Sequence, residues 1–496
     1  MFKMKSIIRS LLVLLLVMSF ASCASDNISD FPIANDNSKV FLSVSINVAG
    51  EDSETTRAED YYFEPKPNGG ENGNGCKKGE IYEQKVHNMS LLFFHSDKAD
   101  LTDGETRIEK VIYFPTVTSE SKFFRTLSVE IDRKYLNDAK LRFLVIANVG
   151  DLSDYRGRKL SEVRDQLITN VFERTTDAKY LESGDLDGYS AFVMSSYDQS
   201  SLNIKEGSGT EEDPFIISHK IERLAARIDI MPHVNRYQLD SEGLNCKYCY
   251  NVTQGTDIIG GFVLEYVRPY NIMNSKEYVF KRTAKNASLE DLQYLGKETE
   301  DASKNSTNYV VDPTSTDKSK ASYKYPKNAV EYWAKDTYDS FYKTHNAGKT
   351  HTFSKSTKAT SRAKVYNPET AFYILDYVKE NTSFDNNEQY ATGLVFKGKY
   401  YEKSDWVVAT DAEIKAGGSS HPKDGAVGTD KAYTYVIRHS DPTGKGTTSD
   451  PMHYGIVRNN IYRVRIDGIT GKGPDGMKVT LNVRKWATYT HEETTM

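Results

Sequence analysis

A pair of cysteines three positions apart is the first place in the sequence where residue types and spacing could support chemistry. Cys246-Lys-Tyr-Cys249 has the spacing of one half of a structural zinc site. A tetrahedral zinc needs a second pair of ligands, and no Cys-x-x-Cys or His-x-His pair follows at a suitable distance. The pattern therefore favours a loop pair that is either reduced or joined by a local disulfide, with Cys76 apart from it.

An acidic turn could offer oxygen ligands to calcium. Ser183-Gly-Asp-Leu-Asp-Gly188 imitates the first part of a calcium loop through Asp185 and Asp187. The twelfth position of an EF-hand loop falls on Met194, where a bidentate glutamate is required, so an EF-hand is excluded and a simple turn is the better interpretation.

Common catalytic motifs are absent from the sequence. It contains no Gly-x-Ser-x-Gly elbow, no glycine-rich phosphate loop that opens a helix, and no His-Glu-x-x-His. Its 10 histidines are scattered singly, and a lone histidine is usually structural. We therefore predict a protein that is not an enzyme and that binds neither a cofactor nor a metal.

Composition narrows the class of protein further. The 496 residues suffice for roughly two to four domains, each with its own core. Lys and Arg number 64 against 69 Asp and Glu, and this net charge of -5 excludes a generally basic nucleic-acid binder. Four cysteines in so long a chain exclude a disulfide scaffold.

The first 22 residues have the pattern of an export signal. Lys3, Lys5 and Arg9 precede an uninterrupted apolar run, Leu11 to Met18, which is too short to span a bilayer comfortably. The small residues Ala21 and Ser22 stand before Cys23, as in a bacterial lipobox whose cysteine is acylated, although Phe20 replaces the usual leucine. We expect a lipid on Cys23 and an exported protein; a plain secretory signal is the alternative.

The clearest structural pattern follows the signal. Alternation of period two from Val40 to Val48 predicts a β-strand with one dry face. That face comprises Val40, Leu42, Val44, Ile46 and Val48, and we expect Ser43, Ser45 and Asn47 to point outward or to a polar rim. The polar segment 50–60 and the Gly/Asn-rich segment 65–75 should be exposed.

Short β-branched and aromatic runs recur along the rest of the chain, and one short amphipathic helix is expected near Leu160 to Val171. This spacing is typical of antiparallel β-sandwiches and not of a βαβ series. The turn at 207–214 is the expected hinge between two domains, and the Lys/Ser/Tyr-rich segment 297–364 is an expected surface insertion with a possible helix around Asn328 to Tyr342. The predicted strands are 89–94, 123–131, 141–147, 191–194, 225–230, 261–267, 371–377, 392–396, 433–438, 461–466 and 479–483.

Eight segments in a fixed order make the chain resemble the type V fimbrillins of Bacteroidales, lipoprotein precursors of surface fimbriae, and the minor-fimbrium shaft subunit more than the long-fimbrium one. The resemblance implies an all-β fold of two transthyretin-like antiparallel β-sandwich domains with long loop insertions and a few short helices. The eight segments are 86–94, 143–149, 191–195, 222–230, 380–382, 392–398, 454–463 and 479–486.

The resemblance also implies assembly by donor-strand exchange. An arginine-specific protease would cut between Arg57 and Ala58, remove the lipidated segment 23–57 with its strand, and open a groove for a strand of the next subunit. The expected parts are then a signal peptide 1–22, a propeptide 23–57, and domains 58–216 and 217–496. Expected partners are further copies of the chain, accessory fimbrial subunits, a host or bacterial surface ligand, and the outer membrane through the lipid before cleavage, but no nucleic acid.

The C-terminus departs from this scheme, because Glu492 and Glu493 would be costly in a dry groove. Either the donor strand is short, or it is Met477 to Trp486, or the chain is not a shaft subunit. The candidate donor residues are Met477, Val479, Leu481, Val483 and Trp486. The alternative function is a monomeric surface lipoprotein that binds glycan or host protein through tyrosine-rich loops of its second domain.

Overall fold

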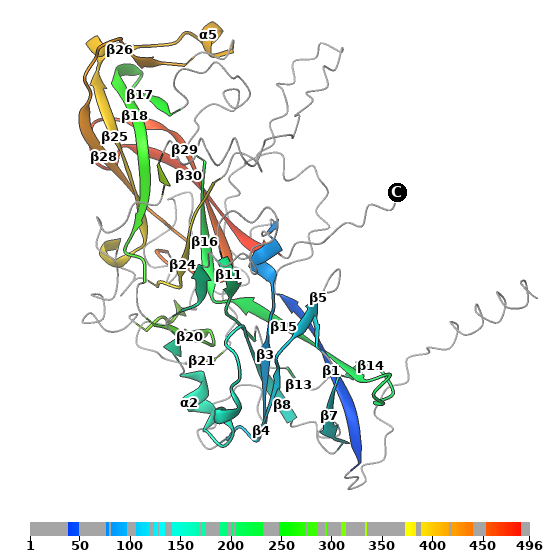
Figure 1. The fold of residues 1–496 in the computed structure, drawn as a ribbon. Helices are drawn as coiled ribbons and strands as arrows, with labels where there is room; N and C mark the ends of the chain where they lie inside the picture. The colour runs from blue at the N-terminus through cyan, green and yellow to red at the C-terminus, as the bar shows by residue number, and fades with distance from the viewer. Residues whose placement is uncertain are drawn as a thin grey trace, which may run out of the picture.

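The structure is a computed structural model, and two large β-sheets dominate it (Figure 1). It describes residues 38–48, 76–78, 81–96, 106–119, 124–126, 128–133, 141–165, 167–168, 170–174, 189–196, 200–201, 204–231, 248–273, 276–284, 293–294, 309–313, 333–334, 373–382, 388–415, 419–439 and 453–487.

The first sheet is built from the N-terminal half of the chain. Its strand β1 (Lys39–Val48) lies inside the sheet, with β15 on one side and β6 and β7 on the other. The order is β4 (Lys110–Phe114), β3 (Met89–His95), β8 (Leu141–Ala147), β12 (Met194–Ser196), β15 (Phe215–Arg223), β1, β6 (Phe124–Thr126) and β5 (Val117–Ser119), with β13 (Ser200–Ser201) on β8, β14 (Ile204–Glu206) on β15 and β7 (Val129–Asp132) on β1.

The second sheet combines a short early strand with the C-terminal half. Its order is β2 (Cys76–Lys78), β30 (Met477–Ala487), β29 (Asn460–Thr470), β17 (Cys249–Gln254), β18 (Asp257–Tyr270), β25 (Gly393–Glu402) and β28 (Thr429–Val436), with β16 (Ala225–Met231) between β24 (Tyr373–Lys379) and β29, and β23 (Trp333–Ala334) on β18. In Figure 1 this sheet occupies the upper half, and the long strands β29 and β30 run down from it to meet the first sheet.

Small elements complete the described chain. The short sheets are β10 (Phe172–Arg174) with β11 (Tyr189–Phe192), β9 (Leu167–Ile168) with β19 (Glu277–Tyr278), β20 (Arg282–Ala284) with β21 (Gln293–Tyr294) and β22 (Tyr309–Val310), and β26 (Trp406–Val407) with β27 (His421–Pro422). The helical turns are η2 (Ile81–Gln84), η4 (Ser153–Tyr155), α2 (Leu160–Arg164), η8 (Glu388–Tyr390), η9 (Lys403–Asp405) and α5 (Asp411–Lys415). No helix in the described ranges combines the length and apolar character needed to cross a membrane.

The predicted all-β class is confirmed, and strands occupy all the predicted strand segments. The helix predicted from Leu160 to Val171 ends at Arg164, and Trp333–Ala334 are paired as a strand where a helix was expected. The sheets are mixed and not purely antiparallel, because β1 with β15 and β16 with β29 are parallel pairs. Each of these parallel pairs joins strands far apart in the chain, which leaves ample length for the crossover that parallel pairing needs.

Two main apolar cores stabilise the fold. The first gathers side chains of β1, β3, β8 and β15, and it also includes Tyr377 and Trp486 from the second sheet. The second gathers residues of β16, β17, β18, β25, β29 and β30. A third, smaller core covers the opposite face of β3, where Leu92 and Phe94 meet α2 and Phe280. The strand is therefore buried on both faces, as its apolar run from Leu91 to Phe94 reflects.

The chain crosses from the first sheet to the second at Leu224, between β15 and β16. The domain boundary predicted at 216/217 falls inside β15, which stays in the first sheet through Arg223. The glycine-rich turn 207–214, expected as a hinge, connects β14 to β15 within the first sheet, and the carbonyl of its Gly209 accepts a hydrogen bond from the backbone N–H of Phe41 (2.9 Å). The turn therefore lies within the first sheet, next to β1.

Candidate functional site: the β1 slot and the junction of the sheets

Strand β1 fills what we call the β1 slot, the position between β15 on one side and β6 and β7 on the other. Its parallel register with β15 runs from Leu42 opposite Phe215 to Val48 opposite Ile221. On the other edge, residues 39–42 pair with β7 and residues 45–46 with β6, both antiparallel. Both edges of β1 are therefore hydrogen-bonded, as in a central strand.

The five residues predicted to share a dry face do so. Val40, Leu42, Val44, Ile46 and Val48 all belong to the first core and are at most 4% exposed. A strand that left the slot would uncover an apolar strip and two rows of backbone hydrogen-bonding groups at once. An added strand can cover such an apolar strip and pair with such backbone groups.

The prediction for the opposite face of β1 is wrong at Ser43 and Ser45. They are 2% and 8% exposed. Ser43 Oγ donates to the backbone carbonyl of Thr126 (2.9 Å), and Thr126 Oγ1 accepts from the N–H of Val44 (2.9 Å). The centre of β1 is thus buried on both faces, and the hydroxyl of Ser43 bonds to β6, the neighbouring strand in the sheet.

The residues predicted for processing lie outside the described chain. Cys23, Arg57 and Ala58 fall in ranges that the structure does not describe, as do Asp185 and Asp187 of the acidic turn. No cluster of three or more His, Cys, Asp or Glu side chains suited to a metal occurs within the described ranges. Cys249 is disulfide-bonded.

The candidate donor strand has a place in the chain's own fold. β30 pairs along its length with β29, and Met477, Leu481 and Val483 are buried in the second core, with Val479 packed against it. Trp486 is fully buried in the first core. Giving β30 to another subunit would therefore remove side chains from both cores of this chain. The tail 488–496 lies outside the described residues.

A buried polar cluster that the sequence did not single out joins the sheets next to Trp486. The carboxylate of Glu83, on η2, accepts hydrogen bonds from Arg227 Nη1 (2.8 and 3.0 Å), from Trp486 Nε1 (2.9 Å) and from the hydroxyl of Tyr377. Arg223 donates to the backbone carbonyls of Glu83 (2.8 Å) and Trp486 (3.1 Å), and its guanidinium lies 4.6 Å from the Trp486 ring centroid. We call these five residues the Glu83 cluster.

The five members of the Glu83 cluster come from four separate parts of the chain: η2, the consecutive strands β15 and β16, β24 and β30. Tyr377 on β24 stacks on Trp486 with the rings 11° from parallel, and Arg227 also pairs with Asp229 (2.8 Å). A buried ion pair of this kind contributes when its remaining hydrogen bonds are satisfied, as several are here. The only local sign was a strand segment, 222–230, that carries Arg223 and Arg227 among apolar residues.

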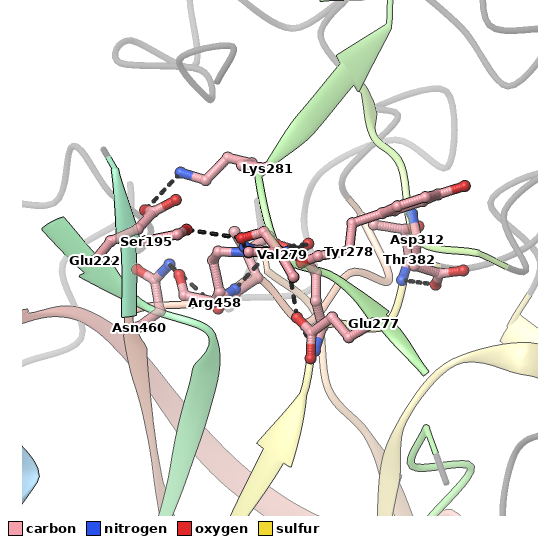
Figure 2. Close-up of polar contacts among 12 residues, drawn as sticks. Ser195, Glu222, Glu277, Tyr278, Val279, Lys281, Asp312, Thr382, Arg458 and Asn460 are labelled. Atoms are coloured by element: carbon pink, nitrogen blue, oxygen red, sulfur yellow. Dashed lines mark hydrogen bonds and ion pairs between the residues drawn. The ribbon is translucent and has the colours of Figure 1, made fainter. Parts of the chain in front are cut away.

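A second buried cluster lies at the same junction (Figure 2). Arg458, fully buried, donates to the carboxylate of Glu380 (3.0 and 3.2 Å) and to the carbonyls of Tyr278 (2.7 Å) and Val279 (3.0 Å), and it forms an ion pair with Glu277 (3.4 Å). Burial, with repulsion from the neighbouring Glu380, raises the pKa of Glu277 to about 8 against the attraction of Arg458.

Two further contacts link residues 277–281, which belong to or adjoin this second cluster, to the first sheet. Ser195 on β12 donates to the carbonyl of Val279 (2.7 Å), and Lys281 pairs with Glu222 of β15 (3.0 Å), both contacts being buried (Figure 2). Two polar clusters thus fix the second sheet against the sheet that holds β1. Neither has the open, substrate-accessible geometry of a catalytic site.

A comparison with models of protein families finds a match in the C-terminal part of the chain. Residues 428–492, which include β28, β29 and β30, match the family model described as "Major fimbrial subunit protein type IV, Fimbrillin, C-terminal". This match confirms the resemblance to fimbrillins. It supports a role as a subunit of cell-surface fimbriae, in a structural rather than an enzymatic class of protein.

Two solved structures of fimbrial proteins align with most of the chain. The fimbrilin FimA from Porphyromonas gingivalis is 14% identical, with 90% of this chain and 98% of that chain covered at a TM-score of 0.39. The tip fimbrial protein Mfa3 from the same organism is 12% identical, with 90% and 100% covered at a TM-score of 0.34. Both scores lie below 0.5, so these likenesses are weak. No curated protein matches the sequence.

Proposed function

We propose that the chain is a structural subunit of a surface fimbria that polymerises when β1 leaves its slot and a strand of another subunit takes its place. The observation that carries the proposal is the position of β1: it is both the first described strand of the chain and a central strand of the first sheet. A first strand can be removed by a single cut after it, whereas removal of an inner segment would need two.

The slot offers an incoming strand a large gross energy of apolar burial. Burying five aliphatic side chains contributes roughly 1.5–3 kcal/mol each, or ~8–15 kcal/mol before the cost of ordering the incoming strand. The hydrogen bonds to β15, β6 and β7 add directionality and register.

The proposed route to the surface follows from the N-terminus. The chain is exported, acylated on Cys23 and held on the outer membrane, and an arginine-specific protease then cuts after Arg57 so that the lipid and β1 depart together. The disulfide at Cys249 supports passage through an oxidising compartment, where such bonds persist. The assembled fimbria would bind a host or bacterial surface ligand.

The donor strand in this scheme is not β30. Its transfer would strip Leu481 and Val483 from the second core and Trp486 from the Glu83 cluster. The tail beyond Ala487 is the remaining candidate at the C-terminus, despite Glu492 and Glu493.

Replacement of Arg57 tests the proposal. Treatment of the purified precursor with an arginine-specific protease should yield ladders on a denaturing gel run without boiling, and Arg57→Ala should give only monomer. The matched control is Arg156→Ala, which removes another exposed arginine and should leave the ladders unchanged. Ladders from Arg57→Ala would place maturation elsewhere, and a cleaved wild-type protein that stays monomeric would favour the monomeric adhesin.

A further inference from the structure

A single imidazole lies in the wall of the β1 slot. His219, on β15, is the register partner of Ile46 and is 1% exposed. In a parallel pair, register partners on one face lie side by side, so Ile46 covers one flank of the ring. His219 is therefore the polar member of an otherwise apolar row that comprises Phe215, Ile217 and Ile221.

The other flank of the ring has a fixed polar partner. His219 Nε2 lies 2.8 Å from Ser196 Oγ, and that oxygen also accepts a hydrogen bond from the N–H of Val145 (2.7 Å). The Phe143 ring centroid lies 4.6 Å from the imidazole centroid. Ser196, Val145 and Phe143 belong to β12 and β8, so this environment stays in place when β1 departs.

Charged groups on the strands around His219 lie on other faces of the sheet or at other positions along the strands. Lys220 is the exposed neighbour of His219 on β15, and Arg142 of β8, adjacent to Phe143, points away and donates to the carbonyl of Ser96 (3.3 Å). The charges at the start of β1 pair with one another, Lys39 with Asp132 (2.6 Å) and with Glu130 (3.6 Å). β12 contributes only Met194, Ser195 and Ser196.

We propose that a strand can occupy the β1 slot only while His219 is neutral, so that His219 selects an aliphatic residue at the Ile46 position and couples strand occupancy to protonation. The proposal rests on the proposed function, in which β1 is the strand that leaves. Burial lowers the pKa of His219 to about 3 with β1 in place. Once β1 leaves and one flank of the ring meets water, we expect the pKa of His219 to return close to the ordinary ~6.5.

The sign of the coupling follows from these two pKa values. Well above pH 6.5, His219 is neutral both with β1 in the slot and with β1 out of it, so protonation favours neither state. As the pH falls below 6.5, only the open state takes up a proton, so opening becomes more frequent. The difference predicts that the equilibrium constant for opening rises about fourfold between pH 7.5 and pH 6, and about thirtyfold between pH 7.5 and pH 5.

Hydrogen exchange of the full-length, uncut precursor measures this opening. Peptides that contain residues 40–48 should, after correction for the intrinsic pH dependence of amide exchange, show about a thirtyfold more frequent opening at pH 5 than at pH 7.5. Peptides from β25 in the second sheet report global unfolding, which also exposes His219, and they should stay more protected than residues 40–48 at both pH values, so that the opening of β1 is separated from global unfolding. Because no protease or polymer is involved, the outcome is independent of whether cleavage at Arg57 and polymerisation occur.

Two variants separate His219 from general acid effects. His219→Gln keeps a hydrogen-bonding group beside Ser196 but does not titrate, and it should flatten the pH profile of β1. His439→Gln is the matched control: His439 is also buried, with a pKa lowered by burial to about 4, but it lies in the other half of the molecule and should leave the β1 profile unchanged.

The wild-type profile alone is decisive if His219→Gln fails to fold. A β1 opening equilibrium that changes less than threefold between pH 7.5 and pH 5 in the wild-type precursor would overturn the proposal. So would a wild-type profile that persists in His219→Gln.

Discussion

Replacement of Val44 by aspartate is the sharpest perturbation of the β1 slot. Val44 is 0% exposed, lies in the middle of the five-residue apolar face and is paired with Ile217. Holding the new carboxyl protonated in the core at pH 7 costs ~4 kcal/mol, and the lost valine burial adds ~1.5–3 kcal/mol. Together these give roughly 5–7 kcal/mol against the strand-filled state.

Strand β1, unlike β8, can leave the first sheet while the rest of the sheet stays folded. The gross ~8–15 kcal/mol of apolar burial in β1 is largely offset by ordering its backbone, at ~1–2 kcal/mol per residue, so its net docking energy is smaller than the penalty. We therefore expect Val44→Asp to expel β1 while the rest of the first sheet stays folded, and the opened subunits to aggregate or polymerise without proteolysis.

Size-exclusion chromatography and hydrogen exchange of the uncut precursor provide the assay. In Val44→Asp the peptides of residues 40–48 should exchange at the earliest time point, while β8 stays protected and larger species appear. Ser128→Asp, at an exposed serine just before β7, is the matched control and should resemble wild type. Ser45→Asp should also open the slot, because Ser45 is buried. If Val44→Asp elutes as a monomer with β1 protected, β1 does not pack through this face and the reasoning fails.

Three further predictions concern the junction and the anchor. Glu83→Ala should lower the free energy of unfolding in urea by about 3–5 kcal/mol, since it leaves Arg227 buried without this partner. The control Glu109→Ala breaks only an exposed pair with His95 and should cost less than about 1 kcal/mol. Equal losses in the two variants would contradict the buried network. Glu277→Gln should remove a pH dependence of stability. The folded pKa of Glu277 is about 8, above the ordinary 4.5, so the native side chain retains a proton that the unfolded chain releases. Wild-type stability should therefore fall by about 3–4 kcal/mol as the pH rises from 5 to 8, and the variant should lose less. Cys23→Ala should shift the precursor from the membrane to the soluble fraction, and an unmodified N-terminal peptide in the wild type by mass spectrometry would refute acylation.

Local patterns were enough to predict the strands. The alternation from Val40 to Val48, and runs such as Leu141 to Ala147 and Ile461 to Ile466, lie within a few residues of one another and report directly which side of a strand is dry. The order of eight such segments was enough to predict a fimbrillin, a prediction that the family match of residues 428–492 confirms.

Only the tertiary structure decided what lies beside each strand. Nothing near β1 in the sequence indicates that β15 and β6 would enclose it, so the burial of Ser43 and Ser45 could not be predicted from their own polarity. For the same reason nothing in the sequence marked Glu83 as buried, although residues up to 403 positions away, Trp486 among them, provide its hydrogen bonds. Whether a polar side chain is buried depends on which distant segments cover it and bond to it. The sequence contains those segments but does not show that they come together in the fold.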